Sequence, residues 1–225
     1  MPPEDLNPAA SAFEIETFAL GDFQTNCFVV SRPSGAAWLI DVGQAPGSML
    51  DHVERAGLRV EKIVLTHAHA DHIAGLAEAL EVFPDVPVYI HADEQTFCGD
   101  PSLNLSQFIS QPIVAPTPTD TLAHGGTLDL DGLPFGVRHT PGHSPGGITL
   151  YQPDHGVAIV GDTLFAGSIG RFDFPTSDGA VLIKSIHEQL LTLPDETRVL
   201  PGHGPETTVG RERGANPYLR ETPLH

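Results

Sequence analysis

The stretch THAHADH at residues 66–72 constrains this chain more than any other part of its sequence, because it places three imidazoles and a carboxylate within seven consecutive residues. It directly follows the apolar run at residues 63–65. Side chains alternate in direction along a strand, so His67 and His69 can point the same way where that strand ends. Asp71 and His72 come just before a helix-compatible segment at residues 73–83, where the chain must turn. One short loop can therefore begin two metal sites.

The charge balance excludes several classes of partner. Asp and Glu total 29 against 11 Lys and Arg, which gives a formal net charge of -18. Such a chain repels nucleic acid and anionic membranes, so we expect neither as a partner. At 225 residues the chain suits one large domain or two small ones. We expect a loose tail at residues 1–12 and a single domain at residues 13–225, and the sequence leaves the oligomeric state open.

The cysteines and the N-terminal residues indicate a cellular compartment. Cys27 and Cys98 lie far apart without CxxC spacing, which argues against a disulfide framework or a thiolate zinc site, and we expect two buried thiols. The first residues, MPPED, lack the basic start and apolar run of a secretory signal. A cytoplasmic protein is therefore expected.

Strand-like runs and helix patterns recur in both halves of the chain, which suggests two similar layers that face each other. Turn-forming residues at 32–35 predict a hairpin between the strands beside them, and residues 93–120 form a less regular stretch that we expect to wall one side of the active site. Helices are expected at residues 46–56, 73–83 and 179–193. The expected strands are residues 13–20, 27–31, 36–41, 59–65, 86–90, 127–130, 135–140, 147–151, 157–161 and 198–200.

Four separate segments offer metal ligands, each at a predicted strand end or in a glycine-bearing loop. A catalytic zinc ion takes about four nitrogen or oxygen ligands and keeps a position open for water. Seven ligands with one shared carboxylate would therefore fill two such sites. Asp162 is the natural bridge, because a carboxylate has two oxygens whereas an imidazole has one free lone pair. The seven candidates are His67, His69, Asp71, His72, His143, Asp162 and His203.

The motifs THAHADHIAG, HTPGHSPGG, GDTLFAGSIGRFDFP and PGHGPETT, in this order, resemble the metallo-β-lactamase superfamily. Within it they are similar to the glyoxalase II-like (hydroxyacylglutathione hydrolase-like) enzymes of the compact bacterial type, over residues 13–218. The resemblance implies an α+β fold, a four-layer αβ/βα sandwich of two mixed β-sheets with helices on the outer faces. The metals would lie in a cleft along one sheet edge.

The resemblance also implies a division of the ligands between the two ions. His67, His69 and His143 match the first site, Asp71, His72 and His203 the second, and Asp162 bridges them. Asp41, in the motif IDVG, matches a position that supports the histidine loop. His139 lies beside the His143 loop, and we expect it to support that loop.

The charge of such a site predicts hydrolysis. Two divalent ions outweigh two aspartates, and a metal lowers the pKa of bound water from 15.7 to about 7, so a bridging hydroxide can attack a polarised carbonyl. Asp71 and Asp162 are the predicted catalytic carboxylates. A thiol of pKa about 8.5 leaves with little help from an acid, which favours a thioester. The resemblance points to S-2-hydroxyacyl glutathione, such as S-lactoylglutathione, and to zinc, with iron or manganese as alternatives.

The residues that would bind the substrate are less clearly marked. Larger glyoxalase II enzymes carry a C-terminal helical domain that supplies basic residues for glutathione, whereas only a short segment follows His203 here. The candidates for an anionic thiol tail are Arg171, Lys184, Arg211 and Arg213, and Phe172 is a candidate to line the pocket. Arg171 has an alternative role as an ion-pair partner of Asp173.

Other functions fit parts of the pattern. Similar folds hold a single iron through two histidines and one carboxylate, here His67, His143 and Asp162, and oxidise glutathione persulfide. A purely structural metal site would be closed by four protein ligands, and seven ligands for two ions leave open positions, so this reading ranks last. The predicted location and Asp71 in the second site argue against a β-lactamase.

Overall fold

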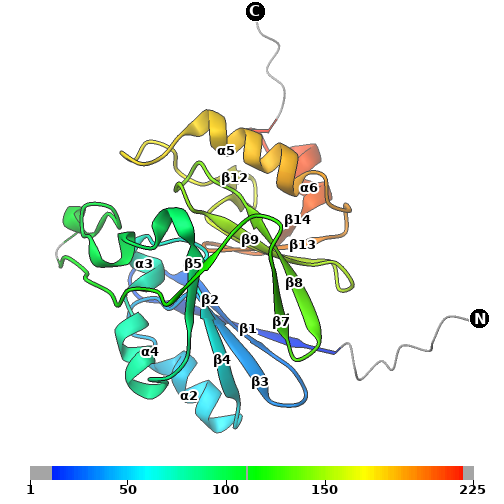
Figure 1. The fold of residues 1–225 in the computed structure, drawn as a ribbon. Coiled ribbons are helices and arrows are strands. Elements are labelled where there is room, and N and C mark those ends of the chain that lie inside the picture. The colour runs from blue at the N-terminus through cyan, green and yellow to red at the C-terminus, as the bar shows by residue number, and fades with distance from the viewer. Residues whose placement is uncertain (1–11, 110, 220–225) are drawn as a thin grey trace, which may run out of the picture.

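The computed structural model describes residues 12–109 and 111–219, and these residues build two large β-sheets (Figure 1). The first sheet is mixed: its first three strands are antiparallel neighbours, and the next three join in parallel. Turn-forming residues connect β2 and β3, which confirms the predicted hairpin. The strands of this sheet, in spatial order, are β1 (Glu14–Leu20), β2 (Thr25–Ser31), β3 (Ala36–Ile40), β4 (Arg59–Val64), β5 (Val88–His91) and β6 (Asp120–Leu122).

The second sheet is also mixed, because β10 and β13 run parallel while its other neighbouring strands are antiparallel. Beside it lies a short hairpin of β11 (Leu164–Phe165) and β12 (Ser168–Ile169). The strands of the second sheet, in spatial order, are β14 (Thr207–Thr208), β13 (Arg198–Pro201), β10 (Val157–Gly161), β9 (Ile148–Gln152), β8 (Leu133–His139) and β7 (Thr127–Leu130).

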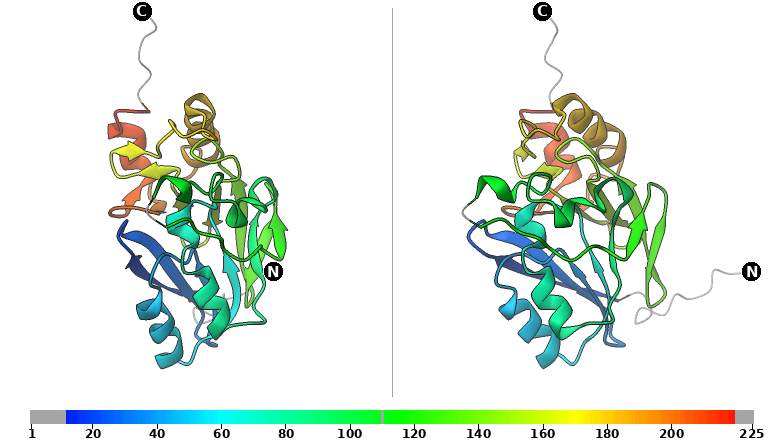
Figure 2. Two further views of the ribbon diagram at one scale, coloured as in Figure 1. Left: turned by 90° about the vertical axis from the view of Figure 1, so that its left-hand side faces the viewer. Right: turned by 60° about the vertical axis from the view of Figure 1, so that its left-hand side comes forward.

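Three apolar clusters hold the layers together. The central cluster lies between the two sheets, where the rings of Trp38 and Phe135 are 5.3 Å apart between centroids. A second cluster packs helices α2 (Gly47–Arg55) and α4 (Leu76–Val82) onto the outer face of the first sheet, and a third packs α5 (Gly179–Ser185) and α6 (Val209–Ala215) onto the second. Figures 1 and 2 show these helices on the outside of the sheets. The predicted α+β four-layer sandwich is confirmed.

The histidine loop differs in detail from the prediction. Strand β4 ends at Val64, so His67 and His69 lie in a loop, and strand alternation is not what brings their rings together. The helix predicted at residues 73–83 is divided into α3 (Ala70–Ile73) and α4, and α3 includes Asp71 and His72. The division falls at Gly75, where a Cβ atom would come within 2.2 Å of a backbone oxygen of Gly43. The close approach of these two loops requires glycine there.

The irregular stretch lies where it was expected, as three 3₁₀ turns between β5 and β6: η1 (Ala92–Glu94), η2 (Phe97–Gly99) and η3 (Ser106–Phe108). In Figure 1 this segment (green) runs beside α3. The prediction for residues 179–193 also holds in part, because α5 continues into a π-helical turn, η4 (Ile186–Leu190). The short elements β6, β11, β12, β14 and α6 were not predicted.

The ends of the chain bear on two further expectations. The predicted tail at residues 1–12 lies outside the described residues except for Ala12. Within the part of the chain that the structure describes, no helix is both long and apolar enough to cross a membrane.

Both cysteines are buried free thiols, as predicted. Burial raises the pKa of Cys27 and of Cys98 to about 12, and alkylating reagents attack the thiolate. We therefore expect iodoacetamide at pH 8 to label neither cysteine in the native protein and both after denaturation, as counted by intact mass. Rapid labelling of either cysteine in the native protein would contradict the burial described here.

Candidate metal centre

The seven candidate ligands come from five places in the fold that meet at one edge of the sandwich. His67 and His69 lie in the loop after β4, and Asp71 and His72 begin α3. The second sheet supplies three residues beyond its strand ends, namely His143 after β8, Asp162 after β10 and His203 after β13. The structure thus brings together all seven residues that the sequence singled out.

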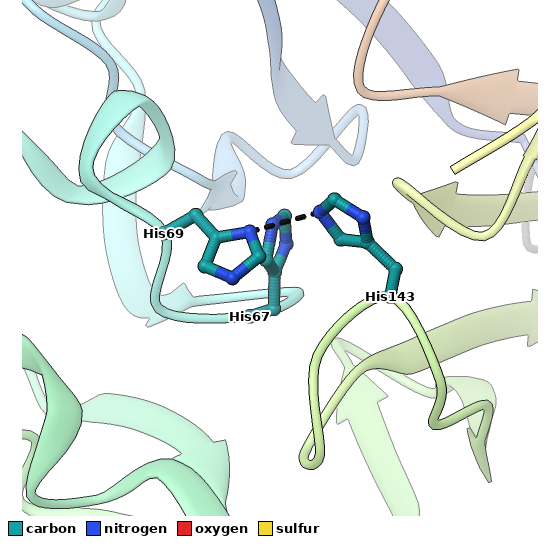
Figure 3. Close-up of side chains that lie close together, drawn as sticks. All are labelled: His67, His69 and His143. Atoms are coloured by element: carbon teal, nitrogen blue, oxygen red, sulfur yellow. Dashed lines mark hydrogen bonds between the residues drawn. The ribbon is translucent and has the colours of Figure 1, made fainter. Parts of the chain in front are cut away.

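Three imidazoles form one group. His67, His69 and His143 each offer a ring nitrogen, and these nitrogens lie within 4.8 Å of one another. His69 Nδ1 and His143 Nε2 are 2.8 Å apart. Figure 3 shows the rings of His67 and His69, from one loop, facing that of His143 from the opposite loop. This is the first ligand group inferred from the sequence.

A second group combines Asp71, His72 and His203. Asp71 Oδ2 lies 3.1 Å from His203 Nε2 and 3.4 Å from His72 Nε2. Asp162 stands between the groups: its Oδ1 is 3.4 Å from His72 Nε2, and its Oδ2 is 3.5 Å from His143 Nε2. Gly202 leaves the space for this carboxylate, because a Cβ atom there would come within 2.2 Å of Asp162 Oδ1.

Buried atoms without hydrogen-bond partners indicate that these residues fit metal ions. Among the described residues, the Nε2 atoms of His67, His69 and His72 and Oδ1 of Asp162 are buried and have no hydrogen-bond partner. A buried polar atom left unpaired costs free energy, so native structures rarely contain four such atoms on neighbouring side chains. Imidazole nitrogen and carboxylate oxygen are the donors that catalytic zinc and iron take. The residues present therefore fit divalent metal ions.

The opposite ring nitrogens are held by the protein. His72 Nδ1 lies 2.8 Å from Asp41 Oδ2, and His143 Nδ1 lies 2.7 Å from the backbone oxygen of Arg171. Metal-binding histidines commonly donate their second ring N–H in this way, which fixes the tautomer and the ring orientation. The nitrogens that face the centre are thus left free to accept a metal.

The pKa values match this arrangement. Burial lowers the pKa of His67, and burial together with His143 lowers that of His69 to about 3, so both rings are neutral and offer a lone pair at neutral pH. Burial alone would raise the pKa of Asp71, but His72 and His203 outweigh it and hold it well below its usual range. Burial likewise lowers the pKa of His72, yet the carboxylates of Asp71, Asp162 and Asp41 raise it overall. The carboxylates therefore favour positive charge at His72, whereas His67 and His69 stay neutral.

Asp41 links the histidine loop to the end of β3. Its Oδ1 accepts the backbone N–H of Thr66 at 2.7 Å, and its Oδ2 accepts the Thr66 hydroxyl at 2.7 Å as well as contacting His72. The residue is fully buried and has a positive φ of 56°, a conformation that asparagine and aspartate adopt more readily than most residues. These contacts match the supporting position assigned to Asp41 by the resemblance.

His139 contacts the His143 loop from the other side. Its Nε2 lies 2.8 Å from the backbone oxygen of Pro145, and its ring stacks on that of His91 at 3.9 Å between centroids. His91, Asp93 and His139 also gather ligand atoms within 4.8 Å. The two rings are nearly parallel, at 10°, so their in-plane lone pairs do not converge on one ion.

Glu94 is a site residue that the sequence reasoning missed. This fully buried carboxylate accepts the backbone N–H of Ala68 at 2.5 Å with Oε2 and that of Gly146 at 2.7 Å with Oε1. Ala68 lies between His67 and His69, and Gly146 lies in the His143 loop, so Glu94 joins the two loops that carry the first ligand group. The available signal was a carboxylate just after the strand predicted at residues 86–90, the same kind of position that the histidine loop occupies.

A cavity of about 560 Å³ opens beside the centre. Arg171 lines it and forms a two-point ion pair with Asp173, at 2.9 and 3.0 Å, so the alternative role proposed for Arg171 is present in the structure. Lys184 and Phe172 are not among the residues that line it: Lys184 pairs with Glu188 on the surface of α5, and Phe172 packs against Gly179. Neither Arg211 nor Arg213 lines the cavity, and Arg213 pairs with Asp195.

The positions of Lys184 and Phe172 in the structure give no support to their predicted roles in substrate binding. Lys184 lies in the last turn of α5 and lines a separate pocket with His139 and Pro141, and Phe172 is 46% exposed. The irregular stretch does reach the cavity, through Asn104, Leu105, Phe108 and Ile109. The expectation that this stretch walls one side of the site is therefore confirmed.

Comparisons with known proteins agree with this geometry. Residues 20–203 match the sequence profile of the Metallo-beta-lactamase superfamily. A probable metallo-hydrolase of Bacillus subtilis, YqgX, is 41% identical over 201 residues, which cover 89% of this chain and 94% of the relative. The hydroxyacylglutathione hydrolase GloC of Haemophilus influenzae is 34% identical over 207 residues, which cover 91% of this chain and 97% of the relative.

Solved structures show the same likeness. The BLEG-1 B3 metallo-beta-lactamase superposes with a TM-score of 0.88 at 37% identity, covering 92% of this chain and 99% of the other. TTHA1623, solved in a di-iron-bound form, superposes with a TM-score of 0.78 at 38% identity, covering 92% of this chain and all of the other. Relatives so similar over nearly the whole chain share its fold.

Proposed function

The chain belongs to the metallo-beta-lactamase superfamily, and from that membership we propose that it is a dinuclear metal-dependent hydrolase that cleaves a thioester. The observation that carries the proposal is the set of unpaired buried atoms at the centre, on His67, His69, His72 and Asp162. Bound cations would satisfy these atoms. S-2-hydroxyacyl glutathione, with S-lactoylglutathione as the simplest case, is the substrate proposed for the first test.

Each ligand has a proposed place. His67, His69 and His143 would hold one ion, Asp71, His72 and His203 the other, and Asp162 would serve both. When bound, the ions supply an activated water at neutral pH and a Lewis acid for the thioester carbonyl. Zinc is the metal proposed, and the similarity to a protein solved with two irons makes iron the first alternative.

The protein's own side chains orient and protect the reaction. Thr25 donates its hydroxyl hydrogen to Asp71 Oδ2 at 2.8 Å, and Asp41 holds the ring of His72. The two residues that would share an ion with His203 are therefore held in place. The wall formed by the irregular stretch limits the access of bulk water from one side. Because a thiolate leaves without protonation, this arrangement requires no separate general acid, and that favours thioesters over amides.

The test compares two reactions on one preparation. Purified protein is analysed for metals per chain, then assayed for hydrolysis of S-lactoylglutathione and for oxygen uptake with glutathione persulfide. We expect two divalent ions per chain and hydrolysis that is lost on chelation and restored by adding zinc. A single iron with persulfide-dependent oxygen uptake and no hydrolysis would instead support the mononuclear dioxygenase.

A further inference from the structure

The cavity beside the metal centre has an apolar wall. Beyond the proposed ligands, most of its lining side chains are apolar, and four of them are phenylalanines. Two stand at its rim, where 57% of Phe23 and 65% of Phe108 remains exposed. Exposed aromatic surface next to a site marks a place where a ligand covers it. The apolar lining residues are Phe23, Ala70, Leu105, Phe108, Ile109, Phe165, Phe174 and Pro175.

The polar residues of the lining are already occupied. Asn104 donates to the backbone oxygens of Cys98 and Ile113 and accepts the N–H of Ser106, so its side chain serves the loop. Arg171 is the one lysine or arginine among the described lining residues, and Asp173, also in the lining, binds its guanidinium at two points. The adjoining cavity, which shares Phe23 and Asp71, is lined by no described lysine or arginine. Apart from the proposed metal centre, neither cavity therefore offers a carboxylate a described lysine or arginine that is unpaired.

One part of the apolar wall, at Leu105, has a strained backbone conformation. Leu105 has a positive φ of 67°, which costs free energy for a residue with a branched side chain. This conformation persists because hydrogen bonds hold both neighbours of Leu105. The backbone oxygen of Asn104 accepts the N–H of Ala70 at 2.8 Å, and the hydroxyl of Ser106 accepts the N–H of Ile113 at 2.8 Å. Ala70 stands between His69 and Asp71. The structure thus joins this part of the apolar wall directly to the loop that carries the proposed ligands.

We infer that this pocket recognises an apolar substituent on its substrate by burial against Phe108 and Phe23, and makes no ion pair with a charged tail. The inference rests on the proposed thioester hydrolysis and names the substrate class within it. The apolar group can belong to the acyl side or to the thiol side of the thioester. A glutathione moiety, with its two carboxylates, gains nothing from this wall.

Two series of thioesters test the inference. In one, the thiol is fixed and the acyl chain runs from acetyl to hexanoyl, and in the other the acetyl group is fixed and the thiol is lengthened. We expect kcat/KM to rise by up to about fourfold for each buried methylene in one series, which identifies the side that meets the wall. We also expect no advantage of glutathione over the neutral thiol N-acetylcysteamine. A flat response in both series, or a preference for glutathione, overturns the inference.

A pair of variants on the same segment provides the control. Phe108→Ala should lower the hexanoyl-to-acetyl ratio of kcat/KM by about tenfold in the responsive series. Val114→Ala removes a side chain that is 71% exposed but lines neither cavity, and it should leave the ratio unchanged. Equal ratios for the two variants overturn the inference.

A binding measurement separates this inference from the proposed function. Calorimetry with a non-hydrolysable hexyl thioether should show weaker binding to Phe108→Ala than to Val114→Ala. If no thioester is hydrolysed but this difference is found, the apolar site stands and the proposed reaction fails. If thioesters are hydrolysed without any such difference, the reaction stands and the apolar site fails.

Discussion

Asp162→Asn is expected to remove most of the metal from both sites and to lower thioester hydrolysis by about 10³-fold or more. The carboxylate lies between the two ligand groups, 3.4 Å from His72 and 3.5 Å from both His143 and His203. An amide brings no negative charge and has only one oxygen to share. Losing the Lewis acid removes several kcal/mol of transition-state stabilisation, and each 1.4 kcal/mol or so is a factor of ten in rate. Elemental analysis and hydrolysis rates on the same sample provide the measurement.

His69→Ala is the matched comparison, because His69 belongs to the first group alone. If the division of ligands is right, this variant keeps the ion held by Asp71, His72 and His203 and loses the other. Circular dichroism should show both variants folded, since none of the three apolar clusters includes either residue. Unchanged metal content in both variants contradicts the ligand assignment, and equal losses contradict the division.

Much of the centre could be predicted from sequence because metal ligation leaves a dense local pattern. Three histidines within six residues have few structural explanations, and the glycines around His143 and His203 mark loops. The same reasoning failed on how His67 and His69 converge, because the strand ends at Val64. The loop geometry depends on contacts of Asp41 with Thr66 and His72, which lie 25 and 31 residues further along the chain. Such distant contacts leave no periodic signal.

The substrate-binding residues show the opposite case. Arg171 and Lys184 were chosen because they are cations near a motif, but a cation near a motif in sequence need not face the site in space. Arg171 does face it and is paired, whereas Lys184 lies on the surface of α5. Part of the apolar wall comes from the irregular stretch, through Leu105, Phe108 and Ile109, where aromatic and aliphatic residues follow no strand or helix period. Its side chains could be located only once β5 and β6 had placed the two ends of that stretch.

Glu94→Gln is expected to weaken metal binding at the first group by about 10- to 100-fold, the range seen when partners that orient metal ligands are removed. Both oxygens of Glu94 accept backbone N–H groups, one from the loop of His67 and His69 and one from the loop of His143. Glutamine keeps one acceptor oxygen, so it can accept only one of the two N–H groups. Its NH₂ group would face the other N–H, and two donors cannot form a hydrogen bond with each other. One of the two loops is therefore released.

A structural role alone would lower stability without this selectivity, so the measurement must separate the two. Chelator competition should show a lower metal affinity at the first ligand group of Glu94→Gln, while the second group binds as in the parent protein. The d–d spectrum of the cobalt-loaded form should also change. Asp93→Asn is the control, since the neighbouring carboxylate is 58% exposed and bonds to neither loop. Because the first ligand group is assembled from two loops that share no strand, the buried carboxylate that joins them should matter for metal affinity even though it touches no metal itself. A loss of thermal stability with both affinities unchanged would contradict that role.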